Sequence, residues 1–433
     1  MKLLVVVQRY GADINGGAEL HARHLAGCLA RFADVRVLTT CARDYITWRN
    51  ELPAGADDVD GIPVERFPVV HERGALEFAR RSRRVFEEWH SVADELAWME
   101  AEGPTCPALV DRVRTLGGAC DFALFFSARY YHAYHGCRAV PGKAVLVPTA
   151  EREPSMGLAI VGQVFRGVRA VMYNSPEERA MVEDLSGNAS VPGTVVGIGV
   201  DIGLTGDASR FRAKYGIEGP YLLYVGRIDR NKGCDTLFDH FRTFARTAVR
   251  PPTLVLIGSA VIPVPDHPRV RHLGFVSDAD KFDAMAGAAA LVMPSPFESL
   301  SMVVLEAWAQ GRPVIVNGHC EVLVGQCLRA GGGLYYRNGD EFAAALHLLL
   351  EDETLADRLG RSGQTYCRRE YAWPVIETKY RTMLETLGRE PAPAGRMAPV
   401  AGWLDRRRRV LPPAAVRVAG AATSPEARQE RAS

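Results

Sequence analysis

Two carboxylates stand out in the segment from Met293 to Val316, MPSPFESLSMVVLEAWAQGRPVIV, which is otherwise built mainly of apolar and small residues. They are Glu298 and Glu306, which lie eight positions apart. On an ideal helix eight positions turn roughly 800°, which leaves the two side chains about 80° apart. A shared helix face therefore does not explain the pair, and we interpret the two acids as reaching one ligand from different local structures.

Each acid has its own place in the local pattern. LVMPS (residues 291–295) has the composition of a buried strand, and MVVLEAWA (302–309) that of a helix ended by Gly and Pro. Ser299 or Ser301 can cap this helix. The first acid then precedes the helix, and the second lies about one and a half turns inside it.

The backbone at this helix start supplies a third element. The first N–H groups of a helix have no partner within the helix, and the helix dipole favours an anion beside them. Here these groups belong to the stretch from Ser299 through Leu300 and Ser301 to Val303. A ligand with a phosphate centre and hydroxyl groups on both sides would satisfy the two acids and these donors, and nucleotide-sugars have that shape.

A second group of candidates lies in YVGRIDRNKG (224–233). A strand is expected to end at Gly226, which leaves Arg227 and Lys232 in the loop before the next helix. Arg can bind a diphosphate as a planar fork and Lys as a point charge. A loop cation alone is usually only solvated, but these two lie at a strand end that matches the one before the acids. Together the segments favour a diphosphate site.

Short apolar runs such as LLVVV, FALFF, YLLYV and TLVLI alternate with helical stretches along most of the chain. Continuously apolar strands with helical crossovers are typical of parallel sheets covered on both faces. Two such series meet in a glycine-containing linker at residues 201–209. The fold class predicted is therefore α/β, with two doubly wound Rossmann-like domains, residues 1–200 and 201–372, facing each other across a cleft.

Composition limits the classes of function. The net charge of +1 argues against nucleic-acid binding by the whole protein, because no basic field gathers phosphates. The nine cysteines contain no C-x-x-C pair, so we interpret them as reduced thiols of a cytoplasmic protein. The apolar run Leu3 to Val7 is too short for a signal segment or a membrane span and fits a buried first strand.

The character of the chain changes at residue 391. Residues 391–433 are rich in Pro, Ala and Arg, lack apolar periodicity and carry a net charge of +5. Such a segment is expected to be disordered. Its stretch WLDRRRRVL (403–411) leaves two roles open, contact with an anionic membrane face and simple solubilisation.

Three segments, in this order, carry a resemblance to a known family: NGGAELHARHLAGCLA (15–30), GRIDRNKG (226–233) and PSPFESLSMVVLEAWAQGRPVI (294–315). The chain resembles the retaining nucleotide-sugar glycosyltransferases of family 4, in the group 1 glycosyltransferases, over roughly residues 1–390. The resemblance implies the GT-B fold, with an N-terminal acceptor domain and a C-terminal donor domain. It also implies that a helix at 373–390 crosses back to the N-terminal domain.

The resemblance implies roles for the charged residues. Those matching Arg227 and Lys232 hold the diphosphate in the family, the acid matching Glu298 binds sugar hydroxyls, and the acid matching Glu306 binds the ribose. Many relatives have a glycine shortly after the first acid, where this chain has Leu300 and a serine. That difference changes the loop without removing its N–H donors.

Two further positions matter in the N-terminal half. Gly16 and Gly17 match a glycine pair that lets the backbone approach donor and acceptor. Glu151 stands where related chains often carry a His that contacts the transferred sugar, and we place it in the donor site with its role open. His132 and His135 are the nearest alternatives, although a partly buried structural role is the more ordinary interpretation of each.

The expected activity is transfer of a hexose from a UDP- or GDP-linked donor to a hydroxyl of a saccharide, glycolipid or small-molecule acceptor, with retained configuration and without a metal. No cofactor is expected, because the nucleotide-sugar is a substrate. A nucleotide-sugar epimerase and a catalytically silent nucleotide-sugar-binding protein are the alternatives. A dinucleotide-dependent oxidoreductase is disfavoured, since YGADINGG lacks G-x-G-x-x-G spacing.

Other signals have structural interpretations. The D-x-D pairs at 58–60 and 278–280 fit a hairpin turn and a helix start better than a metal site. The Arg-rich amphipathic stretch at 79–99 fits a solvated helix face better than a membrane contact. Tyr45 and Trp48, in the loop TTCARDYITWRN, could contact an acceptor or pack in the core, and the sequence leaves both open.

Overall fold

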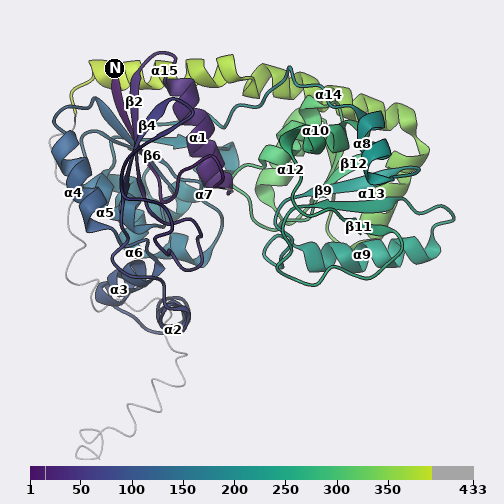
Figure 1. The fold of residues 1–433 in the computed structure, drawn as a ribbon, viewed down its shortest axis with the longest axis horizontal. Coiled ribbons are helices and arrows are strands. Elements are labelled where there is room, and N and C mark those ends of the chain that lie inside the picture. Colours follow the sequence, from purple (N-terminus) through teal and green to yellow (C-terminus); the bar gives the residue numbers. More distant parts are fainter. Residues whose placement is uncertain (15, 393–433) are drawn as a thin grey trace, which may run out of the picture.

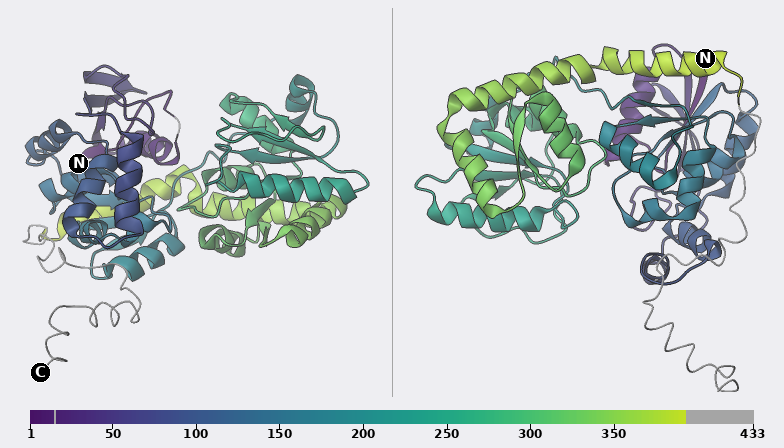
Figure 2. Two further views of the ribbon diagram at one scale, coloured as in Figure 1. Left: turned by 90° about the horizontal axis from the view of Figure 1, so that it is seen from below. Right: turned by 180° about the vertical axis from the view of Figure 1, so that it is seen from behind.

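The structure is a computed structural model that describes residues 1–14 and 16–392. These residues form two α/β domains side by side, and the helices α14 (Glu353–Tyr371) and α15 (Trp373–Arg389) run along one side of both (Figure 1). Two further views show the same arrangement (Figure 2). The predicted disordered tail, with its run of four Arg, lies outside the described residues.

Among the described residues, the N-terminal sheet has eight strands in the order β3-β4-β2-β1-β5-β6-β7-β8. Each neighbouring pair is parallel except the antiparallel hairpin β3–β4. The strand order reverses between β1 and β5, as in a doubly wound sheet. The strands are β1 (Lys2–Val6), β2 (Asp34–Thr40), β3 (Gly55–Val59), β4 (Ile62–Phe67), β5 (Phe122–Phe126), β6 (Ala144–Val147), β7 (Ala170–Tyr173) and β8 (Gly193–Val195).

Helices cover both faces of this sheet, and α2 and α3 project from one end of the domain (Figure 1). Helix α3 begins with a capping box in which the side chains of Ser91 and Asp94 each accept the other's backbone N–H. The helices are α1 (Gly17–Leu29), α2 (Ala75–Phe86), α3 (Val92–Glu102), α4 (Pro107–Leu116), α5 (Tyr131–Ala139), the 3₁₀ turn η1 (Pro154–Gly157), α6 (Ala159–Gly167) and α7 (Pro176–Ser186).

In the C-terminal domain, the described residues form a parallel six-stranded sheet in the order β11-β10-β9-β12-β13-β14. Its order reverses between β9 and β12. Strands β9, β10 and β12 are almost wholly buried, which explains their continuously apolar sequences. The strands are β9 (Tyr221–Val225), β10 (Thr253–Ile257), β11 (Val270–His272), β12 (Ala290–Met293), β13 (Val314–Asn317) and β14 (Gly333–Tyr336).

The helices of this domain flank the sheet on both faces (Figure 1). Besides α14, they are α8 (Ala208–Tyr215), α9 (Cys234–Thr247), α10 (Asp278–Gly287), α11 (Met302–Ala309), α12 (Glu321–Ala330) and α13 (Gly339–Glu351). The prediction of two doubly wound domains is confirmed. The nine cysteines, all within the described range, are buried free thiols, as expected.

The chain passes between the domains twice, and the two passages pair with each other. Val200 forms a parallel bridge with Ala372 and donates its N–H to Tyr371 O at 2.8 Å. A Cβ on Gly199 would lie 2.2 Å from the ring of Trp373, so the first helical residue of α15 packs directly on the first passage. The two crossings therefore form one narrow connection.

Helix α15 belongs to the core of the N-terminal domain. Its buried residues Tyr380, Leu384 and Leu387 lie in one apolar cluster with Leu25 of α1. Arg169, buried before β7, donates to Leu387 O at 3.0 Å and so satisfies a carbonyl at the helix end. The chain thus returns to the first domain after building the second.

The described part of the chain has no helix that is both long enough and apolar enough to cross a membrane. Helix α2, with its Arg-rich face, has its cations paired within the helical hairpin. Glu77 binds Arg80 at 2.8 Å and Arg81 at 2.7 Å, and Glu88 binds Arg83 at 3.2 Å. These contacts agree with a solvated helix face.

The packing of α15 yields a stability prediction. Leu384→Ala should lower the free energy of unfolding by about 2–5 kcal/mol, because it leaves a cavity in the core. Thr382→Ala, an exposed change on the same helix, is the control. Urea denaturation measures both variants, and a Leu384→Ala midpoint equal to that of Thr382→Ala would show that α15 is not part of this core.

Candidate active site

A cavity of about 190 Å³ lies between the two domains. This is smaller than the roughly 300–1,000 Å³ that encloses a whole drug-sized ligand, so it has room for one part of a larger molecule. Residues from both domains line it: Gly17, Ala18, His21, Thr149, Glu151, Asn174, Ile198, Lys232, Glu298, Ser299, Leu300 and Met302. The structure therefore brings together residues that are up to 285 positions apart in the sequence.

The C-terminal domain contributes side chains from two neighbouring strands. Lys232 follows β9 in the loop before α9, and Glu298 follows β12 in the loop before α11. Because β9 and β12 lie at the point where strand order reverses, their ends form the crevice in which open α/β sheets bind ligands. Lys232 Nζ donates to Glu298 Oε1 at 2.8 Å.

The N-terminal domain places its own residues opposite. A Cβ on Gly16 would lie 2.2 Å from Glu19 Oε2, because the Glu19 side chain folds back over this position to bind Arg9. A Cβ on Gly17 would meet nothing within 4 Å, although Gly17 lines the cavity. A side chain at Gly16 would therefore displace Glu19 from its place beside Arg9, and Gly17 leaves its backbone open to a ligand.

Glu151, which follows β6, completes a charge group with the two residues from the other domain. Its Oε1 lies 3.9 Å from Lys232 Nζ. Burial, together with the charge of Glu298, raises the pKa of Glu151 to about 7 against the opposing effect of Lys232. Burial alone would lower the pKa of Lys232, but Glu298 and Glu151 outweigh it and raise that pKa, so the lysine remains charged.

Arg227 lies beside this group but does not line the cavity. Its Nε donates to Asp229, two residues along, and its Nη1 donates to Tyr45 Oη of the N-terminal domain. Gly226, at the end of β9, has φ of 150°, and Gly258 after β10 passes so close that a Cβ there would lie 2.1 Å from Gly226 O. The predicted cations thus occupy one loop, each with an acidic or phenolic partner.

The second acid of the opening segment lies away from the first. Ser301 is the N-cap of α11, and its side chain accepts no capping hydrogen bond. Glu306, inside the helix, accepts from Lys281 Nζ at 2.9 Å. Its other oxygen, Oε2, is buried and has no hydrogen-bond partner among the described residues. The separation of Glu298 from Glu306 agrees with the sequence prediction, and the unpartnered oxygen leaves capacity for a ligand hydroxyl.

Comparison with known proteins fits this geometry. The family model for glycosyl transferases of group 1 matches residues 219–352. Residues 219–352 are a group 1 glycosyltransferase domain. The mannosylfructose-phosphate synthase of Agrobacterium fabrum is 28% identical over 203 residues, which are 41% of this chain and 44% of that protein. The glycogen synthase of Mycobacterium tuberculosis is 24% identical over 413 residues, 87% of this chain and 93% of that protein.

The whole chain also resembles solved structures. HepE of Anabaena in complex with UDP-glucose superposes with a TM-score of 0.67 over 89% of this chain and 100% of that one, at 19% sequence identity. At this identity the likeness establishes the fold, which is GT-B. The expected fold is therefore confirmed. The similarity to the first relative spans less than half of that protein's length.

The structure also shows where the candidate histidines of the N-terminal domain lie. His132 is fully buried, its Nε2 lies 2.8 Å from Phe126 O, and burial lowers its pKa to about 4, so its role is structural. His135 packs on Tyr131 in α5, outside the cavity. His21 of α1 lines the cavity instead, and burial lowers its pKa to about 3, which keeps it neutral.

Sequence reasoning missed six of the twelve lining residues, three of them apolar (Ala18, Ile198 and Met302) and three polar. The polar residues are His21, Thr149 and Asn174. Thr149 and Asn174 follow β6 and β7, so the rule that polar residues after parallel strands meet at one edge would have found them. Asn174 Nδ2 lies 3.4 Å from Ser299 Oγ of the other domain, at the limit of a hydrogen bond. His21 gave no such signal, because it lies on a helix among apolar residues.

A buried carboxylate fixes two of these loops. Glu178 of α7 is 1% exposed and accepts the backbone N–H groups of Ala150 and Asn174. Burial raises the pKa of Glu178 to about 8. The ends of β6 and β7 are thus tied to one side chain, which sets where Glu151 enters the cavity.

The D-x-D segments have the structural roles expected. Asp60 and Gly61 form the turn of the β3–β4 hairpin with φ of 56° and 78°, and Asp60 binds Arg23 at 2.6 Å. Ser277 is the N-cap of α10 and accepts from Asp280 N. Within the described residues, no cluster of His, Cys, Asp or Glu has metal-site geometry.

The raised pKa of Glu151 yields a pH prediction. Below pH 7 Glu151 is neutral, and above it the cavity gains one negative charge, so affinity for an anionic nucleotide-sugar should fall as the pH rises through about 7. One added charge about 6 Å away should cost roughly three- to tenfold in affinity between pH 6 and 8. Glu151→Gln should reduce this dependence to the part that Glu178, with its pKa of about 8, contributes.

Calorimetric titration with a nucleotide-sugar measures the effect, because a nucleotide-sugar diphosphate has no group of its own that titrates near pH 7. Glu385→Gln, an exposed change on α15, is the control. The same slope in Glu151→Gln as in the unmodified protein would assign the titration to another group.

Proposed function

We propose that the protein transfers a sugar from a nucleotide-diphosphate donor to a hydroxyl group of a saccharide, glycolipid or small-molecule acceptor, with retention of anomeric configuration. The observation that carries this proposal is the charge group in the interdomain cavity. Lys232 lies there between Glu298 of its own domain and Glu151 of the other, and residues at the start of α11 line the same cavity. A diphosphate with a sugar on one side matches that combination.

The cations stabilise the leaving group in this proposal. A diphosphate oxygen replaces Glu298 as the partner of Lys232, and a second oxygen accepts from the Arg227 guanidinium. Charge develops on the departing phosphate as the bond to the sugar breaks. Preorganised cations at that position favour the transition state more than the bound substrate.

The two acids then act on hydroxyl groups. Glu298, released from Lys232, accepts hydrogen bonds from the transferred sugar and orients it. Glu306 accepts from the ribose with the oxygen that has no partner among the described residues. A carboxylate can accept several hydrogen bonds, so Glu306 need not leave Lys281 to do so.

Retention follows from attack on the same face of the sugar as the leaving group. Neither Glu298 nor Glu151 acts as a covalent nucleophile in this scheme, because Glu298 binds the sugar hydroxyls and Glu151 stays beside Lys232. The departing phosphate itself takes the proton of the acceptor hydroxyl. The contribution of the protein is orientation and charge stabilisation.

We further propose that the reaction needs no metal and no cofactor. Arg227, Lys232 and the N-terminus of α11 supply the positive charge that a divalent ion supplies elsewhere. The family model and the likeness to HepE, whose structure contains UDP-glucose, support a UDP- or GDP-linked sugar as the donor. We place the protein in the cytoplasm, with peripheral contact at an anionic membrane face as a role for the C-terminal tail.

The central test is turnover with and without the two cations. Arg227→Ala and Lys232→Ala should each lower turnover on the order of 100-fold, as loss of a preorganised charge-stabilising donor does. A panel of nucleotide-sugars with mixed acceptors, read out by product mass and anomeric coupling constant, identifies the active pair. Arg230→Ala, which changes an exposed cation in the same loop, is the control.

Each alternative gives a distinct result in this assay. Conversion of the nucleotide-sugar without any acceptor would indicate an epimerase, and tight donor binding without turnover would indicate a silent binding protein. Near-normal turnover in both cation variants would contradict the assignment of the diphosphate site.

A further inference from the structure

The loop between β2 and β3 reaches across the domain interface with one side chain. Tyr45 accepts a hydrogen bond from Arg227 Nη1, and the Arg227 guanidinium carbon lies 5.0 Å from the centre of the Tyr45 ring. The guanidinium carbon of Arg9, which follows β1, lies 5.5 Å from the same ring. The aromatic ring is thus in contact with one guanidinium from each domain, a favourable arrangement for a cation–π interaction.

These contacts leave some N–H donors of the Arg227 guanidinium available to a ligand. Asp229 takes its Nε–H and Tyr45 one Nη1–H, while Nη2 donates to no partner among the described residues. Asp229 belongs to the same loop and holds Arg227 however the domains lie. Tyr45 belongs to the other domain, so its contact exists only when the domains are together.

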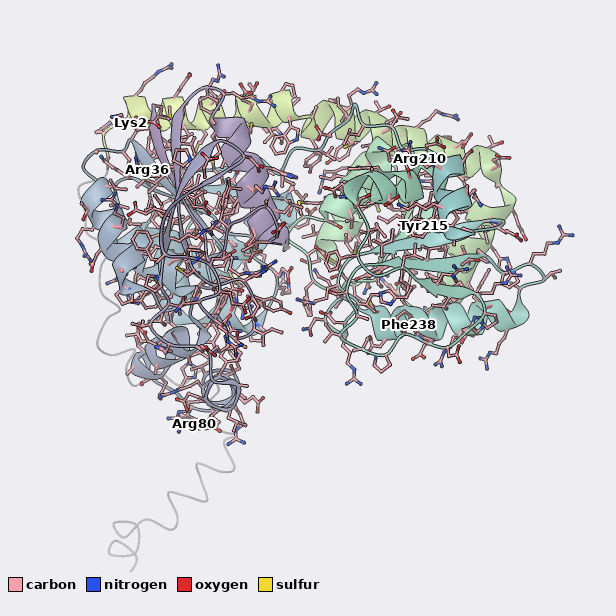
Figure 3. The ribbon with its side chains drawn as sticks, viewed as in Figure 1. Lys2, Arg36, Arg80, Arg210, Tyr215 and Phe238 are labelled. Carbon is pink, nitrogen blue, oxygen red and sulfur yellow. The ribbon has the colours of Figure 1, made fainter. Side chains whose placement is uncertain are left out.

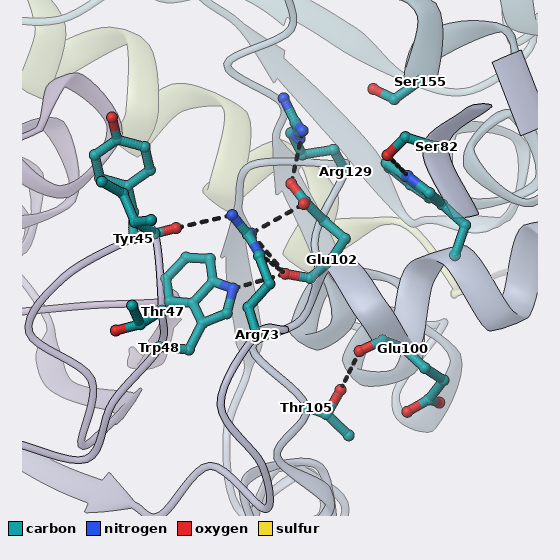
Figure 4. Close-up of polar contacts among 12 residues, drawn as sticks. Tyr45, Thr47, Trp48, Arg73, Ser82, Glu100, Glu102, Thr105, Arg129 and Ser155 are labelled. Atoms are coloured by element: carbon teal, nitrogen blue, oxygen red, sulfur yellow. Dashed lines mark hydrogen bonds and ion pairs between the residues drawn. The ribbon is translucent and has the colours of Figure 1, made fainter. Parts of the chain in front are cut away.

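The Tyr45 loop is rigidly supported, as Figure 4 shows. Arg73 Nη1 donates to Tyr45 O at 3.0 Å, and Arg73 Nη2 donates to Glu102 O at 2.6 Å. The buried Trp48 donates its Nε1–H to the same Glu102 O at 2.6 Å and lies under the Arg73 guanidinium. Trp48 therefore packs in the core, which resolves one of the two aromatic positions left open by the sequence.

The support continues on both sides of Tyr45. Asp44 Oδ1 accepts the N–H groups of Ile46 and Thr47, which closes a turn around Tyr45. Arg9 Nη1 donates to Arg43 O at 2.8 Å, which ties the start of the loop to the residues after β1. The backbone of Tyr45 is therefore fixed to its own domain, while its ring and hydroxyl face the other.

We propose that Tyr45 is a positioning residue that orients Arg227 for the donor diphosphate when the domains close. The hydroxyl holds Nη1 and the ring supports the guanidinium plane, so that the unpartnered Nη2 faces the ligand. The inference rests on the proposed function, because it assigns Arg227 to the diphosphate. Binding of the leaving diphosphate by Arg227 then depends on domain closure, which favours cleavage of the donor only after the cleft has formed.

The test is a double-mutant cycle between Tyr45→Phe and Arg227→Ala. A hydrogen bond to a charged group is lost in Tyr45→Phe while the ring remains, so kcat should fall about 10-fold and affinity for a nucleotide-sugar about threefold. In the Arg227→Ala background, Tyr45→Phe should change neither quantity by more than about twofold, because two residues that act as one unit are not additive. Tyr45→Leu, which also removes the ring, should have a larger effect than Tyr45→Phe.

Tyr215→Phe is the matched control. It removes a hydroxyl from the C-terminal domain, where Figure 3 labels Tyr215, and the Tyr215 ring packs on Phe211. Effects of Tyr45→Phe that multiply with those of Arg227→Ala would show that Tyr45 acts elsewhere, for example on the acceptor. No effect in either background would also overturn the proposal. The affinity cycle needs no turnover, so coupling without transfer would refute the transferase and retain the positioning role.

Discussion

The candidate site depends on one half-buried lysine held between two carboxylates from opposite domains. Lys232 binds Glu298 at 2.8 Å and lies 3.9 Å from Glu151. A charge held away from water costs several kcal/mol when it has no partner. Removing either acid should therefore change the pKa of the lysine and that of the other acid. The same principle holds for Arg227 with Asp229 and for Lys281 with Glu306. In the function proposed above, a diphosphate exchanges partners with these acids rather than entering an unpaired positive site.

The charge group takes residues from both domains, so its assembly needs both sheets. Each sheet reverses its strand order once, between β1 and β5 and between β9 and β12. Lys232 and Glu298 follow the two strands of the second reversal, whereas Glu151 follows β6, the neighbour of β5. The paired crossings at Val200 and Ala372, and the return of α15 to the first domain, keep the two crevices opposite each other. Ion pairs between the domains, such as Arg152 with Glu321 at 3.2 Å, lie at the edge of the cleft. Orientation of the charge group is thus a property of the whole chain.

Much of this could be predicted from local sequence. The apolar strand and the helix around Glu298 and Glu306 are set by short-range rules, so the different placements of the two acids were predictable. The expected cap was not formed, since the Ser301 side chain at the N-cap accepts no capping hydrogen bond. Lys232 and Glu298 could be brought together because both were expected at matching strand ends of one domain, and β9 and β12 are neighbours in the structure. His21 could not, because it lies within a helix and its position depends on how α1 packs on its own sheet, where the His21 ring lies against Phe126. Tyr45 and Trp48 show the limit most clearly. Both are aromatic residues of one loop, yet Trp48 packs in the core and Tyr45 contacts the other domain, a difference that only tertiary packing decides.

The most direct test of this account is a crystal structure of the protein with a bound nucleotide-sugar or its nucleoside diphosphate. The account predicts diphosphate oxygens about 2.7–3.2 Å from Lys232 Nζ and from the Arg227 guanidinium. It also predicts Glu298 turned from Lys232 toward the sugar, and Glu306 on the ribose hydroxyls. A nucleotide bound away from the ends of β9 and β12, or a diphosphate that leaves the Lys232–Glu298 pair intact, would contradict it.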